Sequence, residues 1–317
     1  MNKHSLEQKL PPLWLIKAIN AFRAFLLRLN RNLFPANVVL YEQFELFWLL
    51  PSLYVAAKFD IATILKNKPL TAQEISELLD IDAENISRIL RALASHGIFK
   101  QKPDGHFANN AMSEALLDEP GSLRYMVLHH LGPVNWSLMS NLSYAVRTGK
   151  DAFAEKYGKE IYDYLADHPD ESALFDKSMS NLSDLGLSPI LHAYDFSRFP
   201  LIADIGGGEG FLLGNILAKN HKARGILFDT PPALNKAPAM LARYQVEDRI
   251  DVMPGDFFQT RLPAAGLYIL KNIVHNWSDE KSVLLLQNMS KSMDENSRVL
   301  IIEMIVPTGN KPSLAKL

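Results

Sequence analysis

Apolar and polar residues are arranged in two different ways along the chain, and the change falls near residue 200. Before it, apolar positions recur every three or four residues, which is typical of helices. After it, short apolar runs alternate with helical patterns, and strands are expected near residues 201–205, 225–229, 250–253, 266–271 and 299–305. Strand and helix in regular alternation predict an α/β fold with a doubly wound, mostly parallel sheet.

Residues 71–110 have the pattern of a winged helix. Thr71-Ala-Gln-Glu74 is a capping box that begins one helix, and Asp82 can cap the next. The second helix is expected to end at Gly97. Two short strands with a turn between them are then expected on either side of Pro103-Asp-Gly105.

Winged helices often bind DNA, so the charge of this segment matters. Residues 70–110 carry four basic and six acidic residues. Because neutralised phosphates supply most non-specific DNA affinity, an acidic module is poorly suited to nucleic acid. The segment is therefore predicted to be structural and dimerising, with a DNA-binding regulator as the minority interpretation.

Residues 11–40 contain four basic residues and no acidic ones. An apolar stripe runs along one face of the predicted helix, formed by Leu15, Ile19, Phe22, Leu26, Leu29 and Leu33. The favoured interpretation is an arm that packs on a partner subunit or on the next domain. Contact of residues 11–35 with an anionic membrane is the alternative. The mostly apolar helix expected in residues 41–70 would be buried in the core of a dimer.

Composition excludes several classes of site. The 317 residues are 48% hydrophobic and 21% charged, the formal net charge is −2, and there is no cysteine. The chain therefore forms no disulfide, thiolate metal site or cysteine nucleophile, and the sequence has no clear metal cluster. The first ten residues do not resemble a secretory signal, and Lys17, Arg23 and Arg28 interrupt the only long apolar stretch. A cytoplasmic protein is expected.

The stretch Leu201–Gly210 predicts a ligand site where a strand turns into a helix. Its glycines fall at Gly206, Gly208 and Gly210, so the spacing departs from the dinucleotide pattern G-x-G-x-x-G at Phe211. A nucleoside without a pyrophosphate fits this turn better. The alternative is a tight turn without a ligand.

Acidic residues follow the next two strands. Asp229 ends the second strand, about twenty residues beyond the glycine turn, where a carboxylate can accept both ribose hydroxyls. Asp256 follows the third strand and can accept from an exocyclic amine, while Phe257 can lie against a purine. Each alone could be a helix cap, but together they indicate an adenosine-containing ligand.

The last two strands bring a histidine and a carboxylate. His275 follows the fourth strand, and Glu303 lies within the fifth predicted strand among apolar neighbours. An imidazole beside a carboxylate is a general base held in one tautomer. The alternative makes His275 a capping residue and Glu303 the partner of a lysine or arginine.

The ordered motifs resemble those of S-adenosylmethionine-dependent O-methyltransferases of the caffeate and acetylserotonin type, a family that includes bacterial small-molecule enzymes. The resemblance covers nearly the whole chain after residue 40. It rests on Asp204-Ile-Gly-Gly-Gly-Glu-Gly, Phe228-Asp-Thr-Pro, Gly255-Asp-Phe-Phe, Leu270-Lys-Asn-Ile-Val-His-Asn-Trp and Ile302-Glu-Met-Ile-Val-Pro.

The resemblance implies a Rossmann-like methyltransferase sheet, S-adenosylmethionine as cofactor, no metal, and a small aromatic or polyketide-like molecule as hydroxyl acceptor. Matching cofactor positions are Asp204, Gly206 and Gly208 for the methionine part, Asp229 for the ribose, Asp256 and Phe257 for the adenine, and Lys271 nearby. His275 would be the base and Glu303 would orient it. Trp136, Phe175 and Met179 would contact the acceptor.

The resemblance also implies a homodimer and a division into three regions. These are a helical and winged-helix dimerisation domain (1–110), a helical linker with the acceptor pocket (111–200) and the cofactor domain (201–317). The family continues beyond Leu317 with a helix and a strand pair, so the cofactor domain is expected to be incomplete, with one exposed sheet edge. A non-catalytic, S-adenosylmethionine-binding or dimer-interaction protein is therefore the alternative to an active enzyme.

Overall fold

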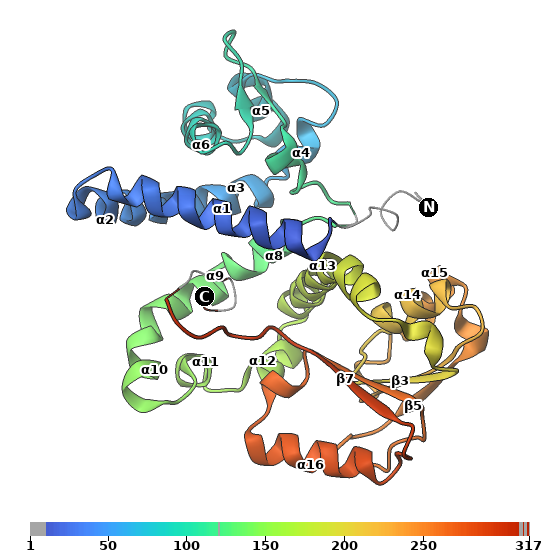
Figure 1. Ribbon diagram of the computed structural model, residues 1–317. Coiled ribbons are helices and arrows are strands. Elements are labelled where there is room, and N and C mark those ends of the chain that lie inside the picture. Colours follow the sequence, from blue (N-terminus) through green and yellow to red (C-terminus); the bar gives the residue numbers. More distant parts are fainter. Residues whose placement is uncertain (1–10, 120, 311–312, 314–315, 317) are drawn as a thin grey trace. The chain divides into compact units, whose positions relative to one another are not determined.

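The computed structural model describes residues 11–119, 121–310, 313 and 316. The chain divides into two compact units, Pro12–Gly186 and the part that begins at Leu187 (Figure 1). The division falls within a long helix, α13 (Pro169–Ala193). The predicted region boundaries near residues 110 and 200 stay a prediction, and the N-terminal ten residues lie outside the described part.

The first half of the unit 12–186 is helical with one small strand pair. Its elements are α1 (Leu13–Asn32), α2 (Ala36–Glu45), η1 (Leu46–Trp48), α3 (Leu49–Lys58), α4 (Ile61–Ile64), α5 (Ala72–Leu79), α6 (Ala83–Ser95), β1 (Lys100–Gln101) and β2 (Phe107–Ala108). Pro35 separates α1 from α2 because proline fits the start of a helix but not its interior. The predicted Thr71–Glu74 capping box and the Asp82 cap are both present. The expected strands pair antiparallel, and Gly97 has a positive φ just beyond α6.

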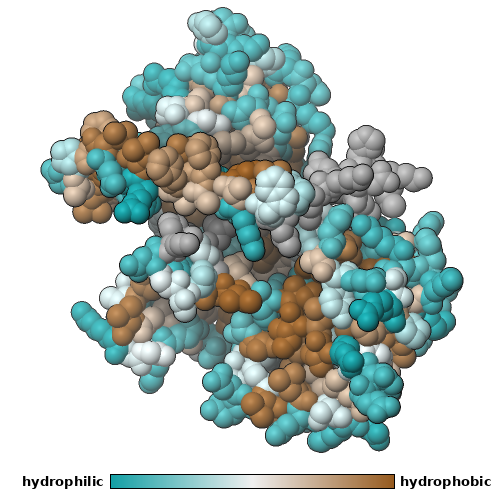
Figure 2. All heavy atoms as spheres, in the orientation of Figure 1, coloured by the Kyte–Doolittle hydropathy of each residue, from teal (hydrophilic) through white to brown (hydrophobic). Residues whose placement is uncertain are grey.

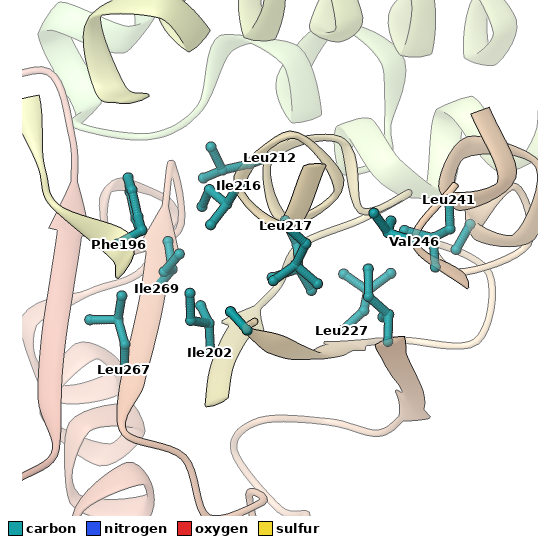
Figure 3. Packing of buried hydrophobic residues seen from close by; sticks show 14 of the residues in the cluster. Phe196, Ile202, Leu212, Ile216, Leu217, Leu227, Leu241, Val246, Leu267 and Ile269 are labelled. Atoms are coloured by element: carbon teal, nitrogen blue, oxygen red, sulfur yellow. The ribbon is translucent and has the colours of Figure 1, made fainter. Parts of the chain in front are cut away.

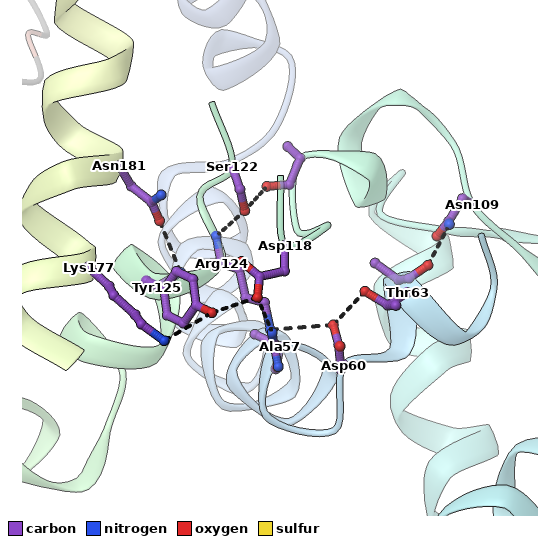
Figure 4. Close-up of polar contacts among 12 residues, drawn as sticks. Ala57, Asp60, Thr63, Asn109, Asp118, Ser122, Arg124, Tyr125, Lys177 and Asn181 are labelled. Carbon is purple, nitrogen blue, oxygen red and sulfur yellow. Dashed lines mark hydrogen bonds and ion pairs between the residues drawn. The ribbon is translucent and has the colours of Figure 1, made fainter. Parts of the chain in front are cut away.

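The second half of this unit is a series of short helices that leads into α13. They are α7 (Ala111–Glu114), α8 (Arg124–His130), α9 (Pro133–Leu138), η2 (Met139–Asn141), α10 (Leu142–Thr148), α11 (Ala152–Tyr157) and α12 (Ile161–Asp167). Figure 4 shows the polar contacts around α8. Arg124 donates to the Ala57 carbonyl at 3.1 Å and pairs with Asp60 at 3.4 Å. The Tyr125 amide donates to Asn181 Oδ1 at 3.1 Å, so α8 is tied to α3 and to α13.

The unit from Leu187 onward is a five-stranded parallel sheet with helices on both faces. Its elements are η3 (Phe196–Arg198), β3 (Leu201–Ile205), α14 (Phe211–Lys219), β4 (Arg224–Asp229), α15 (Ala237–Tyr244), η4 (Glu247–Arg249), β5 (Ile250–Pro254), β6 (Leu267–Lys271), η5 (Val274–Asn276), α16 (Asp279–Ser290) and β7 (Arg298–Ile302). The strand order is β5-β4-β3-β6-β7. The predicted doubly wound parallel sheet is confirmed.

Alternating side chains of β3 supply two hydrophobic layers. Ile202 packs with Leu213 and Ile216 of α14 in the cluster of Figure 3. Ala203 and Ile205 belong to the opposite layer, together with Leu285 and Met289 of α16. Burial on both faces explains why the strands are almost continuously apolar in sequence.

The fifth strand is shorter than predicted. β7 ends at Ile302 rather than at residue 305, so Glu303 lies immediately after the strand instead of within it. The neighbouring strand β6 ends at Lys271, and the Asn272 amide makes the last ladder contact with the Ile302 carbonyl at 3.0 Å. Beyond that point the chain has no partner strand among the described residues, which ends the strand.

Among the described residues, no helix combines the length and hydropathy that a membrane crossing requires. The same part of the chain contains no group of three or more His, Cys, Asp or Glu side chains that could hold a metal ion.

Candidate active site

The glycine turn lies where β3 ends and α14 begins. Gly206 and Gly208 have φ values of 73° and 57°, a backbone conformation that residues other than glycine rarely adopt. A Cβ on Gly206 would lie 2.4 Å from Ile273 Cδ1, so this loop and the loop after β6 approach each other closely. The Gly208 amide donates to Asp229 Oδ2 at 2.8 Å. The turn is thus held against the end of β4, as the parallel sheet predicts.

Asp204 is the buried charged group of this site, with 2% of its surface exposed. Burial raises its pKa to about 7; the charge of Lys271 opposes this rise, and that of Asp229 adds to it. Burial lowers the pKa of Lys271, against the charges of Asp204 and Glu303. A buried carboxylate suits a cationic ligand, because the charge of the ligand compensates the desolvated carboxylate.

Side-chain hydrogen bonds hold the loop after β5 in place. Asp256 accepts from the Phe258 amide at 2.8 Å and from Gln259 at 3.0 Å, so its carboxylate orders the loop as the capping interpretation requires. A carboxylate has further lone pairs that remain for a ligand amine. The Phe257 ring comes within 3.7 Å of a Cβ built on Gly206, so it borders the glycine turn.

Sequence reasoning missed two residues that hold this loop. Asn288 of α16 donates to the carbonyls of Phe257 at 2.9 Å and Thr260 at 2.8 Å. The Trp277 ring makes T-shaped contacts with two rings of the loop. Its centroid lies 4.8 Å from that of Phe258 and 5.9 Å from that of Phe257. The available signal was a polar residue on the apolar face of a helix, since Asn288 is buried between Leu285 and Met289.

His275 and Glu303 form a direct pair. His275 Nδ1 lies 2.6 Å from Glu303 Oε2, and Glu303 Oε1 accepts from the Val274 amide at 2.9 Å. The histidine side chain is 54% exposed and the glutamate 16%. A carboxylate that accepts from Nδ1–H leaves Nε2 able to take a proton. The structure thus pairs Glu303 with His275, and the base role itself stays a prediction.

The three predicted acceptor residues belong to the unit 12–186. Phe175 contacts the His129 ring edge-on at 5.4 Å, and Met179 lies one turn later on α13. Trp136 packs at 5.6 Å from Phe47. Burial, followed by the charge of His130, lowers the pKa of His129 to about 4, so His129 is neutral at physiological pH. His129 is not among the residues that the sequence predicts for the acceptor pocket.

Two family profiles match the chain. The O-methyltransferase domain matches residues 139–317, and the O-methyltransferase dimerisation domain matches residues 41–119. Among similar proteins, phenazine O-methyltransferase PhzM of Lysobacter antibioticus is 34% identical over 89% of this chain and 83% of its own length. Mitomycin biosynthesis 6-O-methyltransferase of Streptomyces lavendulae is 31% identical over 82% of this chain and 75% of its own.

Solved structures give the same result. LaPhzM superposes with a TM-score of 0.82 at 33% identity, covering 89% of this chain and 85% of its own. CalO1, a methyltransferase of calicheamicin biosynthesis solved with S-adenosylhomocysteine, has a TM-score of 0.80 at 30% identity, covering 89% and 84%. With the sheet, the glycine turn and the His275–Glu303 pair in place, the chain belongs to the S-adenosylmethionine-dependent O-methyltransferase family.

Proposed function

We propose that His275 is the general base of this O-methyltransferase and removes the proton from a hydroxyl of a small aromatic or polyketide-like molecule. The observation that carries the proposal is the 2.6 Å contact between His275 Nδ1 and Glu303. Because Nδ1 is engaged, Nε2 is the nitrogen that accepts the hydroxyl proton. The glutamate then stabilises the imidazolium, and the Val274 amide fixes the other carboxylate oxygen.

The residues at the strand ends fit S-adenosylmethionine. When bound, this cofactor supplies a methyl group already activated by a sulfonium charge. Asp204 and Lys271 would lie beside its methionine part, and the positive-φ turn at Gly206 and Gly208 lets the backbone approach it. Asp229 would accept from the ribose hydroxyls. Asp256 would accept a hydrogen bond from the exocyclic amine of the adenine. Phe257 would pack against the adenine ring.

The acceptor proposed is a flat aromatic hydroxyl compound. Phe175, Met179 and Trp136 supply aromatic and thioether surface of the kind that contacts planar apolar rings. The names of similar proteins agree with this class, since they include a phenazine O-methyltransferase and a 3-amino-4-hydroxybenzoate 4-O-methyltransferase. A phenol, whose pKa is near 10, can give its proton to an imidazole while the bond from oxygen to methyl forms.

The test compares methyl transfer by the wild type with that by His275→Ala and Glu303→Gln, over a panel of phenols and hydroxylated nitrogen heteroaromatics. Loss of a positioned base typically costs about 10²–10⁴-fold in kcat. We expect such a loss for His275→Ala and at least a tenfold loss for Glu303→Gln, whose side-chain amide can hold the wrong tautomer. Calorimetric affinity for S-adenosylmethionine should stay within twofold in both variants.

His221→Ala is the matched control, because His221 is an exposed histidine in a loop of the same unit. Turnover by His275→Ala equal to that of the control would contradict the base role. Tight cofactor binding by the wild type with no turnover on any acceptor would instead support a non-catalytic cofactor-binding protein.

A further inference from the structure

Helix α1 is an amphipathic helix whose large apolar side chains stay mostly exposed in the part of the chain that the structure describes. Its large apolar side chains are exposed, with Trp14 at 70% and Phe22 at 60%, and Leu33 just beyond it at 67%. Figure 2 shows apolar surface on the projecting pair α1 and α2. Monomeric proteins rarely expose apolar surface on this scale, so a partner is expected to cover it.

The other face of α1 is basic. Lys17, Arg28 and Arg31 are separated by eleven and three residues, close to whole helical turns, and therefore share one face. The apolar stripe that includes Phe22 and Leu26 lies on the opposite face. There is no acidic residue between positions 11 and 40, although the formal net charge of the whole chain is −2. Residues 11–40 thus carry four positive charges and no negative ones, and Glu42 and Glu45 of α2 line the same pocket as Arg31.

The position of α1 in the chain separates it from the dimerisation domain. The dimerisation match covers residues 41–119 and begins nine residues after the end of α1. Pairing of α1 with its own copy through the apolar stripe would cover that stripe but leave the basic face without a complementary charge. An anionic surface complements both faces, because apolar side chains enter the acyl boundary while lysine and arginine contact the headgroups.

We propose that α1 docks the enzyme on an anionic lipid bilayer, lying in the plane of the interface rather than crossing it. The aromatic and leucine side chains of the stripe insert below the headgroups, and Lys17, Arg23, Arg28 and Arg31 make salt-sensitive contacts with anionic lipids. This proposal is independent of the identity of the catalytic base and of the acceptor.

The experiment is flotation of the full chain with two kinds of vesicle, one of phosphatidylcholine alone and one with 30% phosphatidylglycerol. We expect binding to the anionic vesicles that weakens steeply between 0.1 and 0.5 M salt, roughly as screening shortens the reach of the charges. Each basic side chain near the surface contributes about a fivefold change in partitioning, so Arg28→Gln with Arg31→Gln should lower it by roughly 25-fold. Phe22→Ser with Leu26→Ser should lower it by at least tenfold.

Two controls lie outside α1 in the same unit. Lys100→Gln with Lys102→Gln removes two basic residues near the strand pair, and Leu78→Ser removes an exposed leucine. Both should bind like the wild type. The proposal is overturned if wild type does not float with anionic vesicles, or if α1 variants and controls bind alike. It is also overturned if the α1 variants turn a dimer into monomers in light scattering, which would assign α1 to the interface between copies.

Discussion

Asp204 is buried inside the candidate site and is the group whose charge changes near neutral pH. Its pKa is raised to about 7 by burial, from an ordinary value of 3.8. Between pH 3.8 and about 7, the Asp204 carboxyl is therefore more often protonated in the folded chain than in the unfolded chain. As a result, the contribution of Asp204 to stability falls as pH rises from about 4 to 7. The ionised form, present above pH 7, is the one that attracts a cationic ligand.

This predicts a pH dependence of cofactor affinity. S-adenosylmethionine carries a sulfonium and an ammonium group, so its binding favours ionised Asp204. The dissociation constant should rise by up to tenfold per unit as pH falls below 7, and should level off above pH 8. Titration calorimetry from pH 5.5 to 8.5 measures this.

Asp204→Asn should weaken binding at pH 8 and flatten the profile. Asp251→Asn is the matched control, because Asp251 is an exposed carboxylate on the edge strand β5 and pairs with Arg224. The same slope in wild type and Asp204→Asn would show that another group controls the affinity.

At the scale of elements, one side chain of α16 supplies two hydrogen bonds to the loop after β5. Asn288 satisfies two carbonyls at once, those of Phe257 and Thr260, and is itself buried. Leaving buried acceptors without a donor costs about 1–3 kcal/mol. The loop carries the proposed adenine residues, so its position depends on a helix that contains none of the motif residues.

Asn288→Ala should therefore lower the free energy of unfolding by about 1–3 kcal/mol. It should also weaken S-adenosylmethionine binding more than it lowers kcat at saturating cofactor, because the loop and not the base is displaced. Urea unfolding and steady-state kinetics measure the two effects. The control is Gln287→Ala, an exposed position on the same helix. A variant that is destabilised but binds the cofactor normally would restrict Asn288 to a structural role.

The contrast between β3 and β7 explains how much of the fold the sequence predicts. β3 was predicted at its observed bounds because a buried central strand is a continuous apolar run that ends in glycines. The prediction for β7 ran three residues too far, because Met304 and Ile305 are as apolar as the strand itself. The strand ends because the contact with its partner strand ends at Asn272, and this depends on tertiary structure rather than on the local sequence.

The same division applies to the candidate site. Asp204 and Asp229 lie near the carboxyl ends of their strands and His275 lies shortly after β6, so sequence spacing predicts that they meet at one edge of the sheet. Asn288 and His129 gain their properties from helices packed around them, and nothing in their local sequence specifies those neighbours. The sequence therefore predicts which candidate cofactor residues share one sheet edge, whereas the residues that support them depend on tertiary packing.

For the whole molecule, the exposed apolar residues of α2 and η1 require a second copy. Phe44 is 61% exposed, and Tyr41, Phe47 and Trp48 are also exposed. All four fall within the match to the family's dimerisation domain. Burial of such side chains between two copies is the main favourable contribution to an obligate interface. We therefore expect a dimer of twice the 35.6 kDa chain mass in light scattering.

Phe44→Asp should raise the dissociation constant of that dimer by at least 100-fold, because an unpaired carboxylate would be buried at the interface. Val146→Asp is the control, since Val146 is 80% exposed on α10 and lies outside the dimerisation match. It should remain dimeric. A monomeric wild type, or a Phe44→Asp variant that stays dimeric at nanomolar concentration, would contradict the expected interface. Because the α1 variants are expected to remain dimeric while Phe44→Asp dissociates, the two apolar surfaces can be assigned to different partners.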